Sequence, residues 1–299
     1  MNKECLYYDL ERGGIRCNLC PHKCFIRKNE HGICKVREAK EINGKLKLYT
    51  LNYGEITSIA LDPIEKKPLA KFFEGEKILS IWTFGCNMKC SFCQNYSISQ
   101  FKGMSKFTTV YEIIDIILHT KNNLGIAFTY NEPTICYEYI LEIAKTLKSV
   151  DNSKKVVLVT NGYINEEPLI ELLKYVDALN IDLKGNNDFY KKICFGTLKE
   201  VENTIKIAYK MKKHIEITTL LITNRNTDYD TIKNIGKFIS EIDNNIPLHI
   251  SRYFPRYKME QEQTTLNELK EAFKILKEYL NNVYIGNVTL EEKIYCENT

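Results

Sequence analysis

The chain has 299 residues, of which 44% are hydrophobic and 27% charged, and its formal net charge is +4. This ordinary globular composition excludes a disordered or fibrous chain, and so mild a charge does not indicate a nucleic-acid or membrane-surface protein. No stretch approaches the roughly 18 apolar residues of a membrane span, and the N-terminus lacks the apolar stretch of a secretory signal. We therefore expect a cytoplasmic protein whose eleven cysteines are reduced and serve metal or redox chemistry.

The N-terminal part of the chain differs from the rest. Residues 1–40 are rich in cysteine and charge, and residues 45–61 have the pattern of two strands joined at a Tyr-Gly turn. We predict a cysteine-rich N-terminal extension with a β-hairpin over 1–76, docked on a second domain over 77–299. No low-complexity tract or long linker separates the two.

From residue 77 onward, short β-branched or aromatic runs alternate with stretches of helical periodicity. Strands are expected over 77–85, 125–130, 155–160, 178–185, 214–223, 248–254 and 283–288, and helices over 109–123, 136–150, 166–176, 198–211, 228–242 and 265–280. Such alternation predicts parallel β/α units. Six pairs and a final strand fit an incomplete (β/α)6-type barrel better than a doubly wound sheet. In both architectures, functional groups gather at the carboxyl ends of the strands.

Three cysteines follow the first of these strands with the spacing Cys86-x3-Cys90-x2-Cys93. Three thiolates can hold three irons of a four-iron cluster and leave the fourth iron open to another ligand. The alternative is zinc, but a structural zinc site normally uses four protein ligands, and the next histidine, His119, lies at the far end of a predicted helix. The triplet therefore favours an open [4Fe-4S] cluster.

Four further cysteines lie close together near the N-terminus, at Cys17, Cys20, Cys24 and Cys34. Four thiolates can complete a tetrahedral zinc site or hold a second iron–sulfur cluster, and the sequence leaves these alternatives open. His22 is a possible substitute ligand, but its position between two of the cysteines indicates a solvent-facing side chain.

The remaining cysteines are isolated in the sequence. Free cysteine is among the most frequently buried residue types, so a lone one is more often a small core side chain than a ligand. We interpret four residues in this way: Cys5, Cys136, Cys194 and Cys296.

The cysteine triplet, the aromatic Phe92 before its third cysteine and the β/α repeat together resemble the radical S-adenosylmethionine (radical SAM) superfamily. The resemblance implies that S-adenosylmethionine binds the open iron through its amino and carboxylate groups. One electron from the cluster would then cleave a carbon–sulfur bond and give a 5′-deoxyadenosyl radical, which abstracts hydrogen from a substrate.

Closer similarity is to the activating enzymes of glycyl-radical proteins, including pyruvate formate-lyase activating enzyme. Asn131 and Glu132 stand where that branch has the Gly-Gly-Glu segment that holds the cofactor amino group, and His249 stands where it often has a histidine near the cofactor carboxylate. Phe92 would shield the cluster or stack near adenine. The cofactor contacts implied by the resemblance are Phe92, Asn131, Glu132, Asn161, Asp182, Lys184 and His249.

The N-terminal cysteines, the DPIEKKPL segment (62–69) and the PLHISRY segment (247–253) most closely resemble the radical SAM proteins of the AmmeMemoRadiSam system. That resemblance implies partners of the AMMECR1-like or Memo-like families, a reducing electron donor and a substrate that it does not define. The alternatives are a glycyl-radical activase acting on a partner protein and a non-catalytic iron–sulfur or zinc module. Lys and Arg are spread over predicted helix faces, which does not favour a nucleic-acid substrate, although the superfamily includes RNA-modifying enzymes.

Overall fold

Strands and helices alternate along the second part of the chain in a computed structural model, which describes residues 3–298. The repeat consists of β9 (Lys77–Trp82), α2 (Val110–His119), β11 (Gly125–Phe128), α3 (Tyr137–Val150), β12 (Lys155–Thr160), α4 (Glu166–Leu173), β13 (Ala178–Asp182), α6 (Leu198–Lys210), β14 (His214–Leu221), α7 (Tyr229–Ser240), β15 (Leu248–Arg252), α8 (Leu266–Lys277) and β16 (Val283–Gly286). Each strand and helix expected from residue 77 onward is present, with ends that shift by a few residues.

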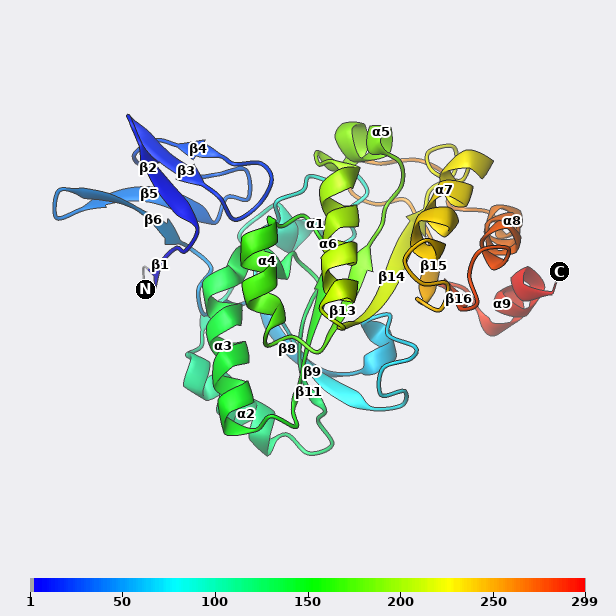
Figure 1. The fold of residues 1–299 in the computed structure, drawn as a ribbon, viewed down its shortest axis with the longest axis horizontal. Coiled ribbons are helices and arrows are strands. Elements are labelled where there is room, and N and C mark those ends of the chain that lie inside the picture. Colours follow the sequence, from blue (N-terminus) through cyan, green and yellow to red (C-terminus); the bar gives the residue numbers. More distant parts are fainter. Residues whose placement is uncertain (1–2, 299) are drawn as a thin grey trace.

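The strands form one eight-stranded sheet in the order β8-β9-β11-β12-β13-β14-β15-β16. All neighbours from β9 to β16 pair in parallel, whereas β8 (Ser58–Pro63) pairs antiparallel with β9. The helices cover one face of the curved sheet (Figure 1). Because β8 and β16 are the two ends of the strand order, the sheet is an incomplete barrel, as the sequence predicted.

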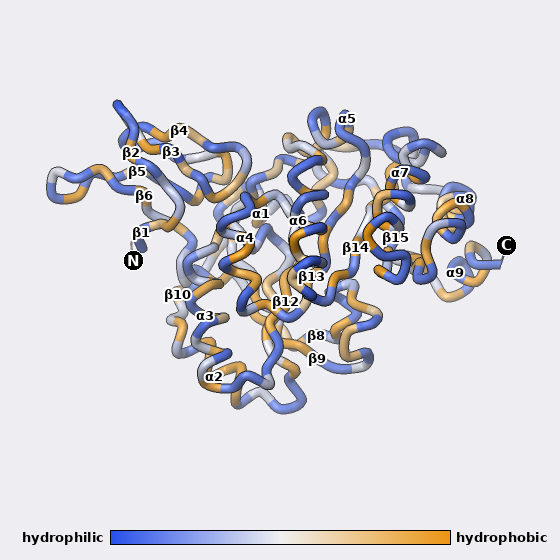
Figure 2. Tube along the Cα trace, in the orientation of Figure 1, coloured by the Kyte–Doolittle hydropathy of each residue, from blue (hydrophilic) through white to orange (hydrophobic). Residues whose placement is uncertain are grey.

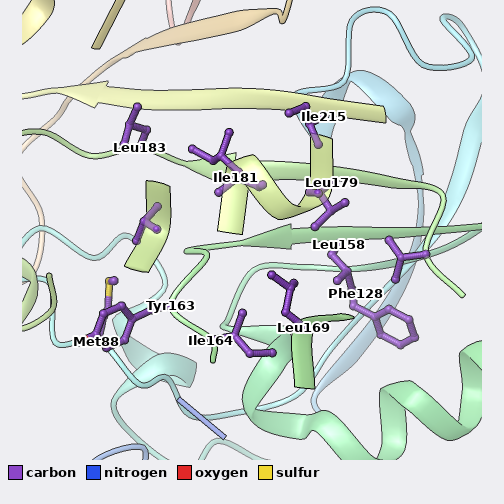
Figure 3. Close-up of a cluster of buried hydrophobic side chains, with 14 of the residues drawn as sticks. Met88, Phe128, Leu158, Tyr163, Ile164, Leu169, Leu179, Ile181, Leu183 and Ile215 are labelled. Carbon is purple, nitrogen blue, oxygen red and sulfur yellow. The ribbon is translucent and has the colours of Figure 1, made fainter. Parts of the chain in front are cut away.

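The outer face of the sheet packs against the helices and forms the main core. Phe128, Leu158 and Leu179 are register partners on adjacent strands and are buried. Figure 3 shows these side chains meeting Leu169 of α4. Along the helices, hydrophobic and hydrophilic residues alternate with the helical period (Figure 2), as expected for helices with one buried side. Among residues 3–298, no helix is long and apolar enough to cross a membrane.

The inner face of the sheet is covered by residues 64–72, here called the floor segment. Ile64, Leu69 and Phe72 pack against small residues of three strands, Ala127, Val157 and Ala178. The Asn180 side chain also donates a hydrogen bond of 2.8 Å to the carbonyl oxygen of Pro68. The floor segment therefore fills the inner face near the amino ends of these strands.

A buried ion pair holds the floor segment to the edge strand. Lys67 is fully buried, and its Nζ lies 2.8 Å from the Asp62 carboxylate of β8. The Tyr130 hydroxyl donates to the same carboxylate at 3.2 Å. Burial of an ion pair is tolerated where further hydrogen bonds satisfy its charges, as they do here.

The N-terminal extension contains two small antiparallel sheets. One consists of β1 (Lys3–Glu4), β6 (Lys45–Thr50) and β5 (Arg37–Ile42), and the other of β2 (Tyr8–Glu11), β3 (Gly14–Cys17) and β4 (Phe25–Ile26). In Figure 1 these strands lie together beside the barrel. The hairpin expected over 45–61 is not formed, because β6 pairs with β5 whereas β8 joins the barrel sheet. Between them, β7 (Glu55–Ile56) pairs with β10 (Lys106–Phe107).

The extension is anchored on α3 by a buried arginine. The guanidinium of Arg37 on β5 pairs with the Glu138 carboxylate of α3, and both side chains are almost completely buried. Arg37 Nη1 also donates to the carbonyl oxygen of Leu6 at 2.9 Å. At the edge of the same contact, Lys3 pairs with Glu142 at 2.9 Å.

Candidate cofactor site at the cysteine loop

The three cysteines of the triplet lie on the loop that follows β9, at the carboxyl end of the sheet. Cys90 is buried, and Cys86 and Cys93 are partly buried. The Met88 backbone N–H donates to Cys86 Sγ at 3.3 Å. The loop begins at Gly85, whose φ of +92° lies in the region that favours glycine. The loop thus folds back at once and turns its sulfur atoms toward the ends of the neighbouring strands.

Asn131 holds the start of this loop against the next strand. Its Nδ2 donates to Thr83 Oγ1 and to the Gly85 carbonyl oxygen, both at 3.1 Å, and its Oδ1 accepts from the Thr83 backbone N–H at 3.1 Å. Tyr130, directly before it, has a positive φ of +68° that directs the chain into this position. The hydrogen bonds of the Asn131 side-chain amide therefore hold the loop in place.

Glu132 is buried and binds the ends of two strands together. Its Oε1 accepts hydrogen bonds from the Thr134 N–H, the Thr134 hydroxyl and the Thr160 hydroxyl, at 3.0, 2.7 and 2.7 Å. Its Oε2 accepts from the Asn161 N–H at 2.8 Å. Burial raises the pKa of Glu132, and these donors oppose the rise. Each carboxylate oxygen offers about two acceptor positions, so Oε2, which accepts one hydrogen bond within the described residues, has room for one more donor.

Asn161 connects the end of β12 with the cysteine loop. Its Nδ2 donates to Asn87 Oδ1 at 2.9 Å and approaches Cys86 Sγ at 3.6 Å. Asn87 in turn donates to the Tyr163 carbonyl oxygen at 2.7 Å. Asn87 was not predicted as a site residue from the sequence, although its position directly after Cys86 indicates that it lies close to the cysteines.

Lys184 and Asp182 lie at the end of β13, against the other two cysteines. Lys184 Nζ lies 2.6 Å from Asp182 Oδ2 and 6.0 Å from the centre of the Phe92 ring. Burial alone would lower the pKa of Lys184, but the Asp182 carboxylate and the nearby Cys90 hold it well above its ordinary value. The Lys184 charge opposes the rise in the pKa of Cys93 that burial causes. An ammonium group therefore faces the cysteine loop and favours thiolates there.

His249 belongs to a different network on the inner face of the sheet. Its Nε2 lies 2.6 Å from Glu216 Oε2, and its ring stacks on Tyr284 with centroids 5.1 Å apart. Its register partner is Thr218, which is also the partner of Asp182. His249 is thus two strands away from Asp182, and its imidazole is bonded to Glu216 rather than to the residues around the cysteine loop.

The four N-terminal cysteines line one small cavity, together with His22 and Arg37. Arg37 Nη1 lies 3.7 Å from Cys17 Sγ, and the Ile33 N–H lies 3.5 Å from Cys24 Sγ. Burial raises the pKa of Cys20 and of Cys34. Within residues 3–298, no three His, Cys, Asp or Glu side chains are arranged as a ready site for a metal ion.

His22 does not face solvent, contrary to the sequence-based interpretation. Its Nε2 lies 2.7 Å from the Asn87 carbonyl oxygen, and its ring meets the Tyr163 ring edge-on at 5.1 Å. Burial lowers the pKa of His22. The tip of the N-terminal cysteine segment therefore packs directly on the cysteine loop of the barrel.

Comparison with known proteins identifies the family of the chain. The family model for the radical SAM superfamily matches residues 80–239, which is more than half of the chain. An uncharacterised protein of Methanocaldococcus jannaschii is 40% identical, with 99% of this chain and 89% of that protein covered. Another protein of that organism, provisionally named a glycyl-radical enzyme activating enzyme, is 30% identical over 70% of this chain and 88% of its own length.

Among solved structures, the fold is similar to a radical SAM methyltransferase from Sphaerobacter thermophilus. The TM-score is 0.57 at 12% sequence identity, and the match covers 74% of this chain and 69% of that one. An identity this low shows a shared fold and does not transfer the methyltransferase activity.

The chain belongs to the radical SAM superfamily. It is an enzyme that uses a [4Fe-4S] cluster and S-adenosylmethionine, and reductive cleavage of S-adenosylmethionine is its chemistry. Membership in this enzyme superfamily argues against the non-catalytic module considered from the sequence.

Proposed function

We propose that Cys86, Cys90 and Cys93 hold the [4Fe-4S] cluster and leave one iron for S-adenosylmethionine, whose cleavage starts hydrogen abstraction from a substrate. When bound, the cluster supplies the single electron for that cleavage. The cysteines need not converge on one point, because each thiolate of a four-iron cluster binds a different iron.

The donors around the three sulfurs carry this proposal. Cys86 receives the Met88 N–H at 3.3 Å and the Asn161 side-chain amide at 3.6 Å. Lys184 places a positive charge beside Cys90 and Cys93. Thiolate ligands and a cluster bring negative charge into a buried loop, and N–H donors with a cation stabilise such charge. The donor set therefore fits the group.

For S-adenosylmethionine, the polar residues at the neighbouring strand ends take different roles. Glu132 Oε2 is the acceptor for the cofactor amino group, because it has room for one more donor. Lys184 and Asp182 lie beside the cysteines, where they would pair with the cofactor carboxylate and hydroxyl groups, and Phe92 lies beside Lys184 as an apolar wall. Asn131 and Asn161 support this arrangement by holding the loop and the Glu132 carboxylate.

His249 contributes through Glu216 in this proposal. Its Nε2 is bonded to the buried Glu216 carboxylate, and this bond fixes the orientation of the imidazole ring. This role is indirect and differs from the direct contact with the cofactor carboxylate that the sequence resemblance implied.

We place the protein in the AmmeMemoRadiSam branch, with protein partners of the AMMECR1-like or Memo-like families. The support is the cysteine-rich N-terminal extension, which packs on the cysteine loop through His22. Similarity to a protein provisionally named an activating enzyme supports a second candidate, a glycyl-radical activase. Electron paramagnetic resonance after incubation with a candidate partner distinguishes the two, because only an activase leaves a glycyl doublet on the partner.

The test is the formation of 5′-deoxyadenosine by anaerobically reconstituted protein with S-adenosylmethionine and a strong reductant. We expect the wild-type protein to form it and Cys90→Ala to lose it, because two remaining thiolates do not hold the cluster. The matched control is Cys296→Ala, which removes a buried thiol from α9 (Leu290–Glu297), away from the site. Full turnover by Cys90→Ala would refute the ligand assignment.

We also propose that Cys17, Cys20, Cys24 and Cys34 hold a second metal group, either zinc or an iron–sulfur cluster. The support is the shared cavity and the guanidinium of Arg37 beside Cys17, which stabilises thiolate charge. Metal analysis with Mössbauer spectroscopy tests this on wild type and on the Cys17→Ala/Cys20→Ala double variant. Loss of one zinc, or of one of two clusters, is expected, and an unchanged metal content would contradict the proposal.

A further inference from the structure

The cysteine loop belongs to one of three segments of the chain that contain no acidic residue. Residues 12–29, 77–111 and 189–199 together contain twelve lysines and arginines and neither aspartate nor glutamate, although the net charge of the whole chain is only +4. The rest of the chain is therefore acidic on balance. Where such segments meet in the fold, they give that part of the surface a positive potential.

Hydrogen bonds bring the three segments together at the cysteine loop. The Lys89 N–H donates to the Cys194 carbonyl oxygen at 3.0 Å. Two residues earlier in the loop, the Asn87 carbonyl oxygen lies 2.7 Å from Nε2 of His22. The loop is therefore in direct contact with the N-terminal cysteine segment and with the end of the π-helix Tyr190–Cys194.

Four exposed lysines come from the residues around this part of the loop: Lys23, Lys89, Lys102 and Lys191. Lys23 directly follows His22, and Lys191 lies on the π-helix. Gln100 Nε2 donates to the Met88 carbonyl oxygen at 3.0 Å, which places the segment that continues to Lys102 beside the loop. None of the three segments supplies a carboxylate that could neutralise these charges.

Aromatic side chains are exposed among the lysines. Phe195 directly follows the π-helix and is 58% exposed, and its φ of +60° is one that a bulky residue rarely adopts. Phe101 directly precedes Lys102 and is 57% exposed. Exposed apolar side chains with a polar rim are typical of surfaces that bind another protein. We call these two aromatic residues and the four lysines the lysine surface.

We propose that the lysine surface binds an acidic electron-carrier protein, which delivers one electron to the cluster. The inference rests on the proposed function, in which Cys86, Cys90 and Cys93 hold the cluster, and it names the partner that supplies the electron. The carrier is oxidised by one electron and the cluster is reduced by one electron, and no bond forms or breaks in this transfer.

The position and the charge of the surface support this partner. The lysines lie on and around the loop that carries the ligands, so a carrier bound there is close to the cluster. Opposite charges steer association, and redox partners form small, transient interfaces that need few contacts. RNA would also be attracted to a basic surface, but it cannot supply the electron that reductive cleavage needs.

The probe is an excess of reduced plant-type [2Fe–2S] ferredoxin, an acidic carrier of low potential. Its binding to the reconstituted protein is measured by biolayer interferometry. Formation of 5′-deoxyadenosine is measured with ferredoxin and, separately, with dithionite, a small reductant that needs no docking surface. The variant Lys23→Glu/Lys102→Glu/Lys191→Glu reverses three charges. Lys89 is retained, because a carboxylate there would act directly on the neighbouring Cys90.

The matched control is Lys121→Glu/Lys210→Glu/Lys274→Glu. These three lysines are also exposed, and they lie in or just after the last turns of α2, α6 and α8, at the end of the sheet opposite to the cysteine loop. The control variant therefore has the same net charge as the test variant and an unchanged lysine surface.

We expect the test variant to bind ferredoxin at least about tenfold more weakly at low salt and to lose ferredoxin-driven turnover to the same extent. Turnover with dithionite, and both properties of the control variant, should remain close to wild type. Salt raised from about 0.01 M to about 0.15 M shortens the Debye length from about 30 Å to about 8 Å. It should therefore weaken binding by the wild-type protein more than binding by the test variant.

Wild-type binding and turnover in the test variant would overturn the inference, as would an equal loss in the control variant. Tighter binding of a single-stranded RNA than of ferredoxin, abolished in the test variant, would make the surface an RNA site instead. If the test variant does not fold, glutamine at the same three positions removes the charges and carries the same expectation with a smaller loss. Wild-type turnover with dithionite but not with ferredoxin would refute only this inference, whereas no turnover with either reductant would refute the proposed function.

Discussion

His22 Nε2 lies 2.7 Å from the backbone carbonyl oxygen of Asn87, so the N-terminal extension touches the barrel at the residue that follows Cys86. His22 itself stands between Cys20 and Cys24. A second contact lies close by, because the carbonyl oxygen of Cys34 packs against Gly85. Two neighbouring contacts therefore join the segment of the N-terminal cysteines to the cysteine loop of the barrel. A change at either contact should alter the cysteine loop.

Replacing His22 by alanine should loosen the cysteine loop. The Asn87 carbonyl oxygen would lose a partner at a partly buried position, which costs about 1–3 kcal/mol. Hydrogen–deuterium exchange measured by mass spectrometry should show faster exchange in residues 86–91. His119→Ala, at an exposed position at the end of α2, is the control. Unchanged exchange in residues 86–91 of His22→Ala would show that the contact does not hold the loop.

Replacing Gly85 by alanine should separate the extension from the loop. A Cβ there would lie 2.7 Å from Val36 Cγ1 and 2.9 Å from Ile135 Cδ1, on top of the strain of a φ of +92°. Overpacking of this kind typically costs 1–3 kcal/mol. The control is Gly13→Ala, which has a φ of +86° but open space around it, so that the difference between the two isolates the clash.

Urea unfolding of both glycine variants measures this difference. We expect Gly85→Ala to be less stable than Gly13→Ala by about 1–3 kcal/mol. Equal losses would mean that backbone strain accounts for the whole effect and that the contact with Val36 adapts without cost.

The Arg37–Glu138 pair should be the strongest single link between the extension and α3. Both side chains are almost fully buried, so alanine at either position leaves an uncompensated buried charge, at a cost of about 3–5 kcal/mol. The double variant should lose less than the sum of the two single losses. The Arg16–Glu11 pair is the matched control, because its side chains are 35% and 40% exposed and such pairs contribute at most about 1 kcal/mol.

Denaturant unfolding of the two cycles compares the pairs directly. The losses in unfolding free energy at Arg37 and Glu138 could instead be additive and equal to those of the exposed pair. That result would show that the buried contact stabilises the protein no more than an exposed ion pair does. The same experiment on reconstituted protein shows whether a bound metal compensates for the loss of Arg37 beside Cys17.

Glu216 should make the protein sensitive to acid. Burial tends to raise its pKa, but hydrogen bonds from His214 and His249 and from the N–H groups of Ala70 and Lys71 lower the pKa to about 2. Because the folded-state pKa is below the unfolded value of about 4.5, the stabilisation is complete above pH 4.5 and is lost as the pH falls toward 2. A shift of this size corresponds to roughly 3 kcal/mol.

The variant Glu216→Gln tests whether Glu216 causes this loss of stability at low pH. At pH 7 it should be less stable than wild type, and its unfolding free energy should change less between pH 5 and pH 3. Glu271→Gln, at an exposed position on α8, should retain the wild-type pH profile. A Glu216→Gln profile parallel to wild type would assign the acid sensitivity to other carboxylates.

The fold of the barrel could be predicted from the sequence because each of its strands and helices has a recognisable local sequence pattern. Helix α2 begins at Thr109 with a capping box completed by Glu112, and its apolar residues recur with the helical period. The extension could not be predicted in the same way. Its short strands are stabilised by partners distant in the chain, as in the pairing of Lys3 with Thr50, and the strand after the Tyr-Gly turn joins the barrel instead.

The residues of the candidate site also differ in whether the local sequence reveals them. The cysteine triplet is visible in the sequence because its ligands are close neighbours on one loop. His22 was predicted to face solvent because its partner, Asn87, lies 65 residues away along the chain. Residues that contact ligands from a distant part of the chain have no local pattern by which they can be recognised.

The floor segment has a kinetic consequence. It covers the inner face of the sheet where Ala127, Val157 and Ala178 lie, so a molecule bound on that face must enter and leave at the carboxyl ends of the strands. S-adenosylmethionine at the strand ends and a substrate above it would then share one entrance. Ordered binding follows, with S-adenosylmethionine before the substrate, and its cleavage products, methionine and 5′-deoxyadenosine, would leave after the substrate-derived product. Product-inhibition patterns would reveal that order.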